Sequence, residues 1–173
     1  MPAEVIAYVA VSLDGYLAGD DGAVDFLEPF GTDEYGFHDF FDSIKAVVMG
    51  SATYEQILGF GWPYGNTPGL VLTTRKLDTP EEPEISFSDE PTGTAIRRYA
   101  DLYDGRVWVV GGGKVITEGL VQGAIDILEM YVMPVVLGSG VPLFSSPYNG
   151  RLDLADTEAF SNGVVKLVYS TTE

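Results

Sequence analysis

The chain has 173 residues, 46% of them hydrophobic, which is enough for one well-buried domain. Its 26 acidic and 9 basic residues give a formal net charge of −17, which repels phosphate backbones and anionic lipids and so argues against nucleic-acid and membrane binding. The absence of cysteine excludes disulfides and thiolate metal sites. No run approaches the roughly 18 apolar residues of a membrane span, and the first residues have no signal-peptide pattern, so we expect a cytoplasmic protein.

In the first third of the chain, residues 5–11 are continuously apolar and predict a strand in a sheet that helices cover on both faces. A glycine-rich, acidic loop follows. Within residues 32–44, phenylalanines recur at helical spacing and predict a helix whose apolar face packs in the core. A second strand at 46–49 ends at Gly50, and Ser51 is expected to cap the helix that follows.

The remaining elements continue this alternation of strands and helices. Strands are predicted at 70–73, 85–87, 106–110 and 126–136, helices at 94–103 and after Gly113, and a final hairpin of 159–161 and 164–169. This order predicts an α/β fold with a mostly parallel central sheet, helices on both faces and a C-terminal antiparallel hairpin, in a single domain over residues 1–173. Ligands of such sheets bind at the carboxyl ends of the strands.

The most informative segment is residues 106–120, where a strand ends in Gly111, Gly112 and Gly113 and a helix begins directly. Glycines let the backbone approach a ligand closely, and the first turn of a helix presents unpaired N–H groups, so this corner suits a phosphate. It is neither a dinucleotide fingerprint nor a P-loop, because a further spaced glycine and a Ser or Thr after Lys114 are missing. A purely structural turn is the alternative interpretation.

Four segments taken together carry a family resemblance. They are Ser12–Ala18 (SLDGYLA), Met49–Glu55 (MGSATYE), Val110–Gly113 (VGGG) and Pro134–Phe144 (PVVLGSGVPLF). The pattern resembles the dihydrofolate reductase superfamily, and most closely the branch that contains the reductase domain of the riboflavin-biosynthesis bifunctional deaminase-reductase, with this chain as a stand-alone member. The resemblance covers nearly the whole chain. It implies a three-layer dihydrofolate reductase-like fold and an NADPH-dependent reductase.

The resemblance also implies where NADPH would lie. The nicotinamide would border the first strand and the loop after it, and the pyrophosphate would lie on the glycine corner. The end of the strand at 70–73 would receive the adenosine 2′-phosphate, for which a guanidinium and two hydroxyls are chemically suited, although a solvated turn is the alternative there. The cofactor-binding residues implied are Ala10, Leu17, Gly50, Ser51, Thr53, Thr73, Thr74, Arg75, Val110, Gly111, Gly112, Gly113, Lys114 and Val115.

The chain departs from the family pattern at positions that matter for chemistry. Ser51 stands where many members have an arginine that contacts cofactor phosphate. The carboxylate that grips the pterin ring in dihydrofolate reductases proper has no counterpart, because the nearest positions are Gly36 and Phe37. Met133 replaces the threonine that supports that carboxylate. Reduction of dihydrofolate itself is therefore disfavoured.

Four side chains are candidates for catalytic roles. Glu34, His38 and Asp39 lie within about one helical turn of the missing carboxylate and are candidate proton donors, among which the sequence does not choose, although a lone histidine is more often a surface or packed residue. Asp14 is a secondary candidate, because a carboxylate in a Leu-Asp-Gly turn more often bonds to the loop backbone. Trp62 and Tyr64 either wall a flat substrate or anchor their own loop. We predict no metal site.

The leading hypothesis is transfer of a hydride from NADPH to a small pyrimidine- or pteridine-like heterocycle, with 5-amino-6-(5-phosphoribosylamino)uracil as the most specific candidate. The alternative is a non-catalytic NADP(H)-binding or regulatory protein with a decayed active site. We expect a small-molecule partner, no nucleic acid and no membrane. We also expect a homodimer, because the sixth strand and the terminal hairpin present edges that need cover.

Overall fold

The computed structural model describes residues 3–31, 34–81 and 83–171, and its centre is one eight-stranded sheet. Parallel strands run in the spatial order β5 (Ile85–Ser88), β4 (Gly69–Leu72), β3 (Ile44–Gly50), β6 (Arg106–Gly111), β1 (Glu4–Ser12) and β7 (Ile127–Met133). β10 (Val165–Ser170) is antiparallel to β7, and β9 (Asp153–Ala159) closes the edge as the other arm of a hairpin with β10. The predicted α/β fold with a C-terminal antiparallel hairpin is confirmed.

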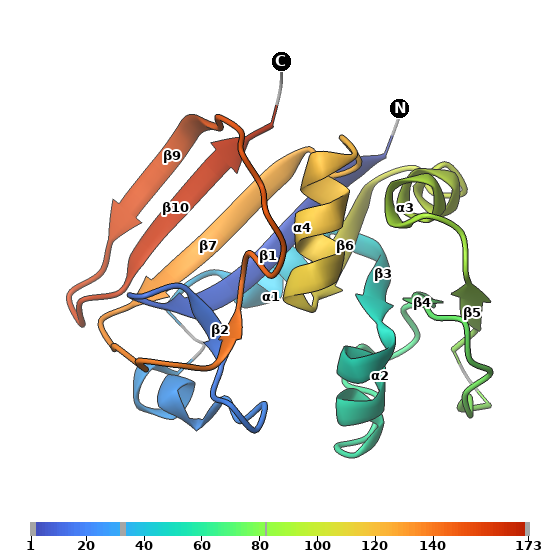
Figure 1. Cartoon of the computed structure of the whole chain (residues 1–173), viewed down its shortest axis with the longest axis horizontal. Coiled ribbons are helices and arrows are strands. Elements are labelled where there is room, and N and C mark those ends of the chain that lie inside the picture. The colour runs from blue at the N-terminus through green and yellow to red at the C-terminus, as the bar shows by residue number, and fades with distance from the viewer. Residues whose placement is uncertain (1–2, 32–33, 82, 172–173) are drawn as a thin grey trace.

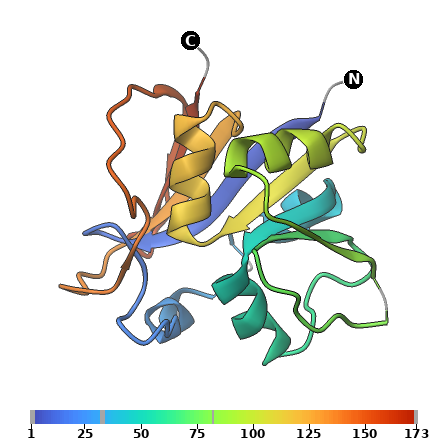
Figure 2. The same ribbon diagram turned by 45° about the vertical axis from the view of Figure 1, so that its right-hand side comes forward.

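Side chains alternate along β1 and divide the core into two layers, one on each face of the sheet. Val5, Ala7 and Val9 are buried in a cluster with α3 (Thr92–Ala100) and α4 (Gly113–Val121). Ile6 is buried on the other face with α1 (Phe37–Asp42) and α2 (Ser51–Leu58). Figure 1 shows α4 in front of the sheet and α1 behind it, and Figure 2 shows α3 beside α4 on the same face. Coverage of both faces explains why β1 is apolar along its length.

Two neighbouring strands send their helices to opposite faces, and this opens a crevice at the strand ends. β3 continues into α2 on one face, and β6, which lies beside β3, continues into α4 on the other. Gly113, the first residue of α4, lies so close to the 142–143 backbone that a Cβ there would be 2.2 Å from the Pro142 carbonyl oxygen. Such a topological switch point is where open α/β sheets bind ligands.

Two motifs far apart in the sequence form one structural unit beside this crevice. The Ser12 hydroxyl donates to Asp14 Oδ1 at 2.6 Å, and the Asp14 carboxylate accepts the backbone N–H groups of Leu137 at 3.1 Å and Gly138 at 2.8 Å. The short strands β2 (Tyr16–Ala18) and β8 (Val141–Pro142) then pair with each other. We call residues 12–18 and 134–143 the flap.

Several elements differ from the prediction in extent. Gly50, with extended backbone angles, is the N-cap of α2, and Ser51 is its first residue without a capping hydrogen bond, so the predicted Ser51 cap is wrong. The helix expected within 32–44 has six residues, and Thr32 lies outside the described residues. α3 begins two residues earlier than predicted and ends at Ala100, and β7 stops at Met133, where the chain turns into the flap.

Three elements were not predicted at all: β2, β8 and the 3-10 helix η1 (Asp25–Phe30). Their sequences lack hydrophobic periodicity, and Pro29 lies inside η1. The prediction also missed most of β9, whose seven residues are all exposed, because the acidic sequence of 153–158 gives no buried face. No helix in the described ranges is long and apolar enough to cross a membrane.

Candidate functional site

Three adjoining cavities lie along the carboxyl ends of the parallel strands. An apolar pocket of about 360 Å³ lies beside β1 and β7, a connecting cavity of about 260 Å³ follows, and a groove of about 450 Å³ lies between α2 and α4. The apolar pocket and the connecting cavity share four wall residues, Tyr8, Ala10, Val24 and Leu27. The connecting cavity and the groove share Thr53, Gly112 and Val141. Shared walls make these cavities one elongated cleft, large enough for a cofactor and a small substrate.

The groove is built to receive an anion. It is lined by the first residues of α2 and α4, and neither helix has a side chain that caps its N-terminal N–H groups. Those groups need a partner, and the positive end of each helix dipole favours a negative one. Gly112 leaves the floor open, since a Cβ there would meet nothing nearer than Thr53 Oγ1 at 3.6 Å. A phosphate group therefore fits between the two helix ends.

The charges around the groove are mixed. Lys114 lies in the first turn of α4 and is the one basic side chain among the described groove residues. Three carboxylates also line the groove, of which Glu90 pairs with Arg98 and Glu118 accepts the Thr92 hydroxyl. Arg98 offsets the charge of Glu90, whereas the Thr92 hydroxyl occupies an oxygen of Glu118 without changing its charge. The groups of the groove that can bind an anion are therefore the helix N-termini and Lys114.

A shallow recess of about 430 Å³ continues the groove beyond β4. It contains Thr73, Thr74 and Arg75, and the Arg75 backbone N–H donates to Thr73 Oγ1 at 3.0 Å. The Arg75 guanidinium forms an ion pair with Glu55 of α2, in which both side chains are about half exposed. An anion in this recess would compete with Glu55 for the guanidinium.

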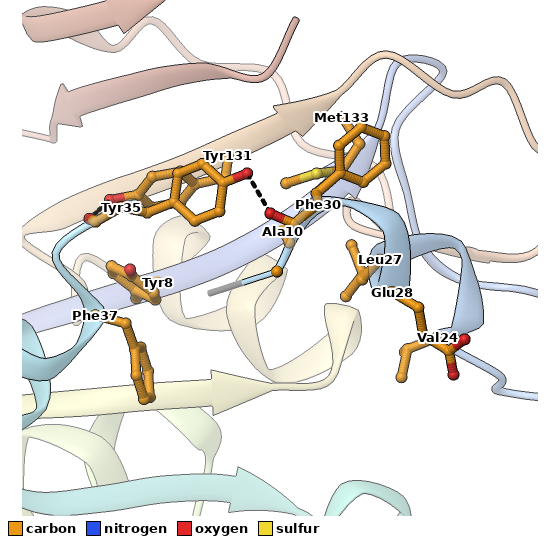
Figure 3. Close-up of a pocket in the computed structure, with 11 residues that line it drawn as sticks. Tyr8, Ala10, Val24, Leu27, Glu28, Phe30, Tyr35, Phe37, Tyr131 and Met133 are labelled. Atoms are coloured by element: carbon orange, nitrogen blue, oxygen red, sulfur yellow. Dashed lines mark hydrogen bonds between the residues drawn. The ribbon is translucent and has the colours of Figure 1, made fainter. Parts of the chain in front are cut away.

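The apolar pocket has aromatic walls (Figure 3). Tyr8, Tyr35, Tyr131 and Phe37 gather at one end, and Met133, Phe30 and Leu27 lie toward the other. Among the described lining residues, Glu28 alone carries a formal charge at neutral pH, and it lies at the end away from the tyrosines. A planar, uncharged molecule would bury its faces against these walls.

Tyrosine hydroxyls and one carboxylate form a polar network at the aromatic end. Tyr131 Oη lies 2.9 Å from Glu129 Oε2 and 3.1 Å from the Tyr35 carbonyl oxygen, and the Tyr35 hydroxyl donates to the Phe30 carbonyl at 2.8 Å. Burial raises the pKa of Tyr131, as do its neighbours Tyr8 and Glu129. Burial also raises the pKa of Tyr8, against the lowering effect of its hydrogen bond with Tyr131. Both phenols therefore keep their protons at neutral pH.

The structure brings the predicted cofactor residues to this cleft. Lining the connecting cavity are Ala10, Leu17, Thr53, Val110, Gly111 and Gly112. Lining the groove are Gly50, Ser51, Thr53, Thr73, Thr74, Gly112, Gly113, Lys114 and Val115, and Arg75 lies in the adjoining recess. Binding by these residues stays a prediction, and their common location supports it.

The predicted catalytic residues are placed differently. Glu34 and His38 are exposed and line none of the cavities described above. Asp14 lies in the flap, where the hydrogen bond from Ser12, with those of Gly138 and Leu137, holds the pKa of its carboxyl below the ordinary value. Its oxygens bind the flap backbone, so its position is that of a loop anchor. Within the described ranges, no group of three or more His, Cys, Asp and Glu side chains could hold a metal ion.

Trp62 and Tyr64, the other candidates for a substrate wall, lie in the core beneath α2. Their rings meet edge to face at 5.0 Å, and Tyr64 is 8% exposed. Gly69 accommodates the Trp62 ring, since a Cβ there would come within 2.9 Å of it. Both residues anchor their loop, and neither lines the cleft.

Tyr8, Glu28 and Tyr131 were missed as site residues. In the sequence, nothing distinguishes Tyr8 and Tyr131 from the other residues of their apolar strands. Glu28 lies in η1, which has no hydrophobic periodicity. The signal for Tyr8 was strand alternation together with the resemblance, which already assigned the neighbouring Ala10 to the site. Phe37 and Met133, the departures from the dihydrofolate reductase pattern, both line the apolar pocket.

Comparison with known proteins agrees with this architecture. The uncharacterized protein YwjB of Bacillus subtilis (strain 168) is 33% identical over 168 residues, covering 95% of this chain and 96% of that protein. A solved structure from Shewanella sp. PV-4, described as a riboflavin biosynthesis protein, superposes with a TM-score of 0.81 at 24% identity and full coverage of both chains. Dihydrofolate reductase from Enterococcus faecalis, complexed with NADP(H), superposes with a TM-score of 0.69 at 21% identity, over 96% of this chain and 95% of that one. The model of the RibD C-terminal domain family matches residues 3–166, and the chain therefore belongs to this family.

Proposed function

We propose that the protein is an NADPH-dependent reductase that transfers a hydride to a small, planar heterocycle. The observation that carries the proposal is the continuous cleft, in which a glycine-floored groove between two uncapped helix N-termini leads past β1 into an apolar, aromatic pocket. Family membership and the NADP(H) complex of the similarly folded enterococcal reductase support the same assignment.

The residues of the cleft fit the parts of a nicotinamide cofactor. Gly112 and Lys114, with the N-termini of α2 and α4, would hold the pyrophosphate. Arg75 would bind the 2′-phosphate after leaving Glu55, which favours NADPH over NADH. Ala10 and Leu17 would border the nicotinamide in the connecting cavity. The cofactor supplies the hydride, and the chain orients both reactants and excludes water from the aromatic pocket.

The pocket favours an uncharged substrate over a phosphorylated one. None of its described lining residues is a lysine or arginine, so a phosphoribosyl group would find no cationic partner there. Among the heterocycles considered, a pterin-like or pyrimidine ring without a phosphate matches the lining best. Dihydrofolate is a poor candidate, because Phe37 and Met133 occupy the wall where a pterin-binding carboxylate and its support would be needed.

The first experiment is titration of the purified protein with NADPH and NADH, followed by nicotinamide fluorescence. Preferential NADPH binding is expected. A second step measures NADPH oxidation with 7,8-dihydropterin, menadione, dihydrofolate and 5-amino-6-(5-phosphoribosylamino)uracil, where an uncharged acceptor should react fastest. If NADPH binds and no acceptor in this panel is reduced, the alternative of a non-catalytic NADP(H)-binding protein replaces the reductase. Homodimer formation and a cytoplasmic location stay predictions.

A further inference from the structure

Tyr8 occupies the junction between the cofactor side and the substrate side of the cleft. Four residues line both the connecting cavity and the apolar pocket: Tyr8, Ala10, Val24 and Leu27. Tyr8 is the one member of this set whose side chain has a proton to donate. A molecule that spans the junction therefore meets a single polar side chain among otherwise apolar walls.

Packing fixes the Tyr8 ring. It stacks on Phe40 with ring centroids 3.9 Å apart and planes 12° from parallel, and it meets the Trp108 ring edge to face at 6.0 Å. The Trp108 indole N–H donates to the Tyr8 backbone carbonyl at 3.1 Å, which holds the strand and the rings together. The position of the hydroxyl is thus set by contacts that a phenylalanine would keep.

Besides Tyr8, the titratable groups that line the pocket come from three elements. Tyr131 comes from β7, where Glu129 lies beside its hydroxyl, Tyr35 from the turn before α1, and Glu28 from η1. The rings of Tyr131 and Tyr8 lie 5.2 Å apart, and the Tyr131 hydroxyl is 2.9 Å from Glu129 Oε2. Glu28 is exposed, and it lines the apolar pocket but not the connecting cavity. It lies at the end of the pocket away from the tyrosines. Tyr8 is therefore better placed than Glu28 to reach a reacting atom near the cofactor.

Building on the proposed reductase function, we propose that the Tyr8 hydroxyl is the proton donor of the reaction. When hydride reaches the carbon of a substrate C=N or C=O bond, the π electron pair moves to the nitrogen or oxygen. That atom forms a bond to the Tyr8 proton as the phenolic O–H bond breaks. The resulting tyrosinate recovers a proton from water when the product leaves.

The test compares Tyr8→Phe with wild type in single-turnover NADPH oxidation, using the acceptor from the panel that wild type reduces fastest. The variant should bind NADPH within about twofold of wild type, because it keeps the ring, while its hydride-transfer rate falls by about 100-fold or more. Between pH 6 and 9 the wild-type rate should be flat. The Tyr8→Phe rate should fall about tenfold per pH unit, because the proton must then come from hydronium.

Two further variants separate chemistry from packing. Tyr169→Phe removes a phenolic hydroxyl on the opposite face of the sheet and should keep the wild-type rate and flat profile. Glu28→Gln tests a rival donor: if Glu28 supplied the proton, this variant, and not Tyr8→Phe, would acquire the tenfold fall in rate per pH unit. An unchanged rate and a flat profile in Tyr8→Phe would overturn the assignment while leaving the reductase standing. Loss of activity in Glu28→Gln alone, or a wild-type rate that already falls tenfold per pH unit, would also overturn it. A wild-type protein that reduces none of the panel removes the proposed function and the donor together.

Discussion

Two adjacent glycines at the phosphate corner should respond differently to alanine, and the structure gives the size of each effect. At Gly113 a Cβ would lie 2.2 Å from the Pro142 carbonyl oxygen and 2.8 Å from that of Leu143, and both are backbone atoms. Overpacking of this kind costs up to about 3 kcal/mol, offset by about 1 kcal/mol from the better helix propensity of alanine. Gly113→Ala should therefore lose about 2 kcal/mol of stability, and its Tm should fall by about 4–8 °C.

At Gly112 the same substitution meets only Thr53 Oγ1, at 3.6 Å, which is an ordinary contact. Its methyl group would instead fill the floor of the groove, where the cofactor pyrophosphate is proposed to approach the backbone. Gly112→Ala should keep a Tm within about 2 °C of wild type, while its NADPH affinity falls at least about tenfold through loss of a charge-assisted hydrogen bond.

Thermal unfolding by circular dichroism and NADPH titration by fluorescence, run on both variants, separate the two effects. A wild-type Tm for Gly113→Ala would show that the 141–143 backbone moves aside at little cost in free energy. The predicted clash with the carbonyl oxygens of Pro142 and Leu143 would then be wrong. Gly112→Ala with wild-type NADPH affinity would remove the pyrophosphate from this corner.

Other predictions follow from the charges and hydroxyls of the site. Arg75→Ala should weaken NADPH binding about tenfold and leave NADH binding unchanged. Glu55→Gln, which frees the Arg75 guanidinium from its ion pair, should strengthen NADPH binding. Equal losses of NADPH and NADH affinity in Arg75→Ala would contradict the assignment of Arg75 to the 2′-phosphate. Because the pKa of Asp14 is lowered in the folded state, its ionised form stabilises the flap above the ordinary carboxyl range, and this contribution disappears as the pH falls through the lowered pKa. Asp14→Asn should thus have a lower Tm than wild type at pH 7. The difference should begin to shrink below about pH 4 and vanish once the carboxyl is protonated in the folded state as well. A difference in Tm that stays constant through this range would refute the role of the charge. In an alkaline titration followed at 295 nm, five of the ten tyrosines should ionise late, because burial raises their pKa: Tyr8, Tyr54, Tyr64, Tyr99 and Tyr131. The stability that these neutral phenols contribute is lost only above about pH 10. Ionisation of all ten tyrosines together near pH 10 in the folded protein would contradict this prediction.

The sequence by itself was sufficient for the central sheet and the phosphate corner, because both depend on local chemistry. Continuous apolar runs predict strands that are buried on both faces, and β1, β3 and β6 lie within one or two residues of the predicted bounds. Glycines after β3 and β6 predict close-approach corners, since no other residue leaves the floor of the groove open.

The tertiary structure decided what the substrate side looks like, because that side is assembled from segments without a local signal. η1 and the flap have no hydrophobic periodicity, yet η1 lines the apolar pocket and the flap lines the connecting cavity beside it. Contacts between residues more than a hundred positions apart, such as those of Asp14 with Leu137 and Gly138, hold the flap together. Tyr8 and Tyr131 look like core residues in the sequence, and only the pairing of β1 with β7 brings their rings together, 5.2 Å apart, at one end of the apolar pocket. Side-chain alternation gives the face on which a strand residue lies, but which neighbours share that face depends on strand order, and strand order is a property of the whole chain.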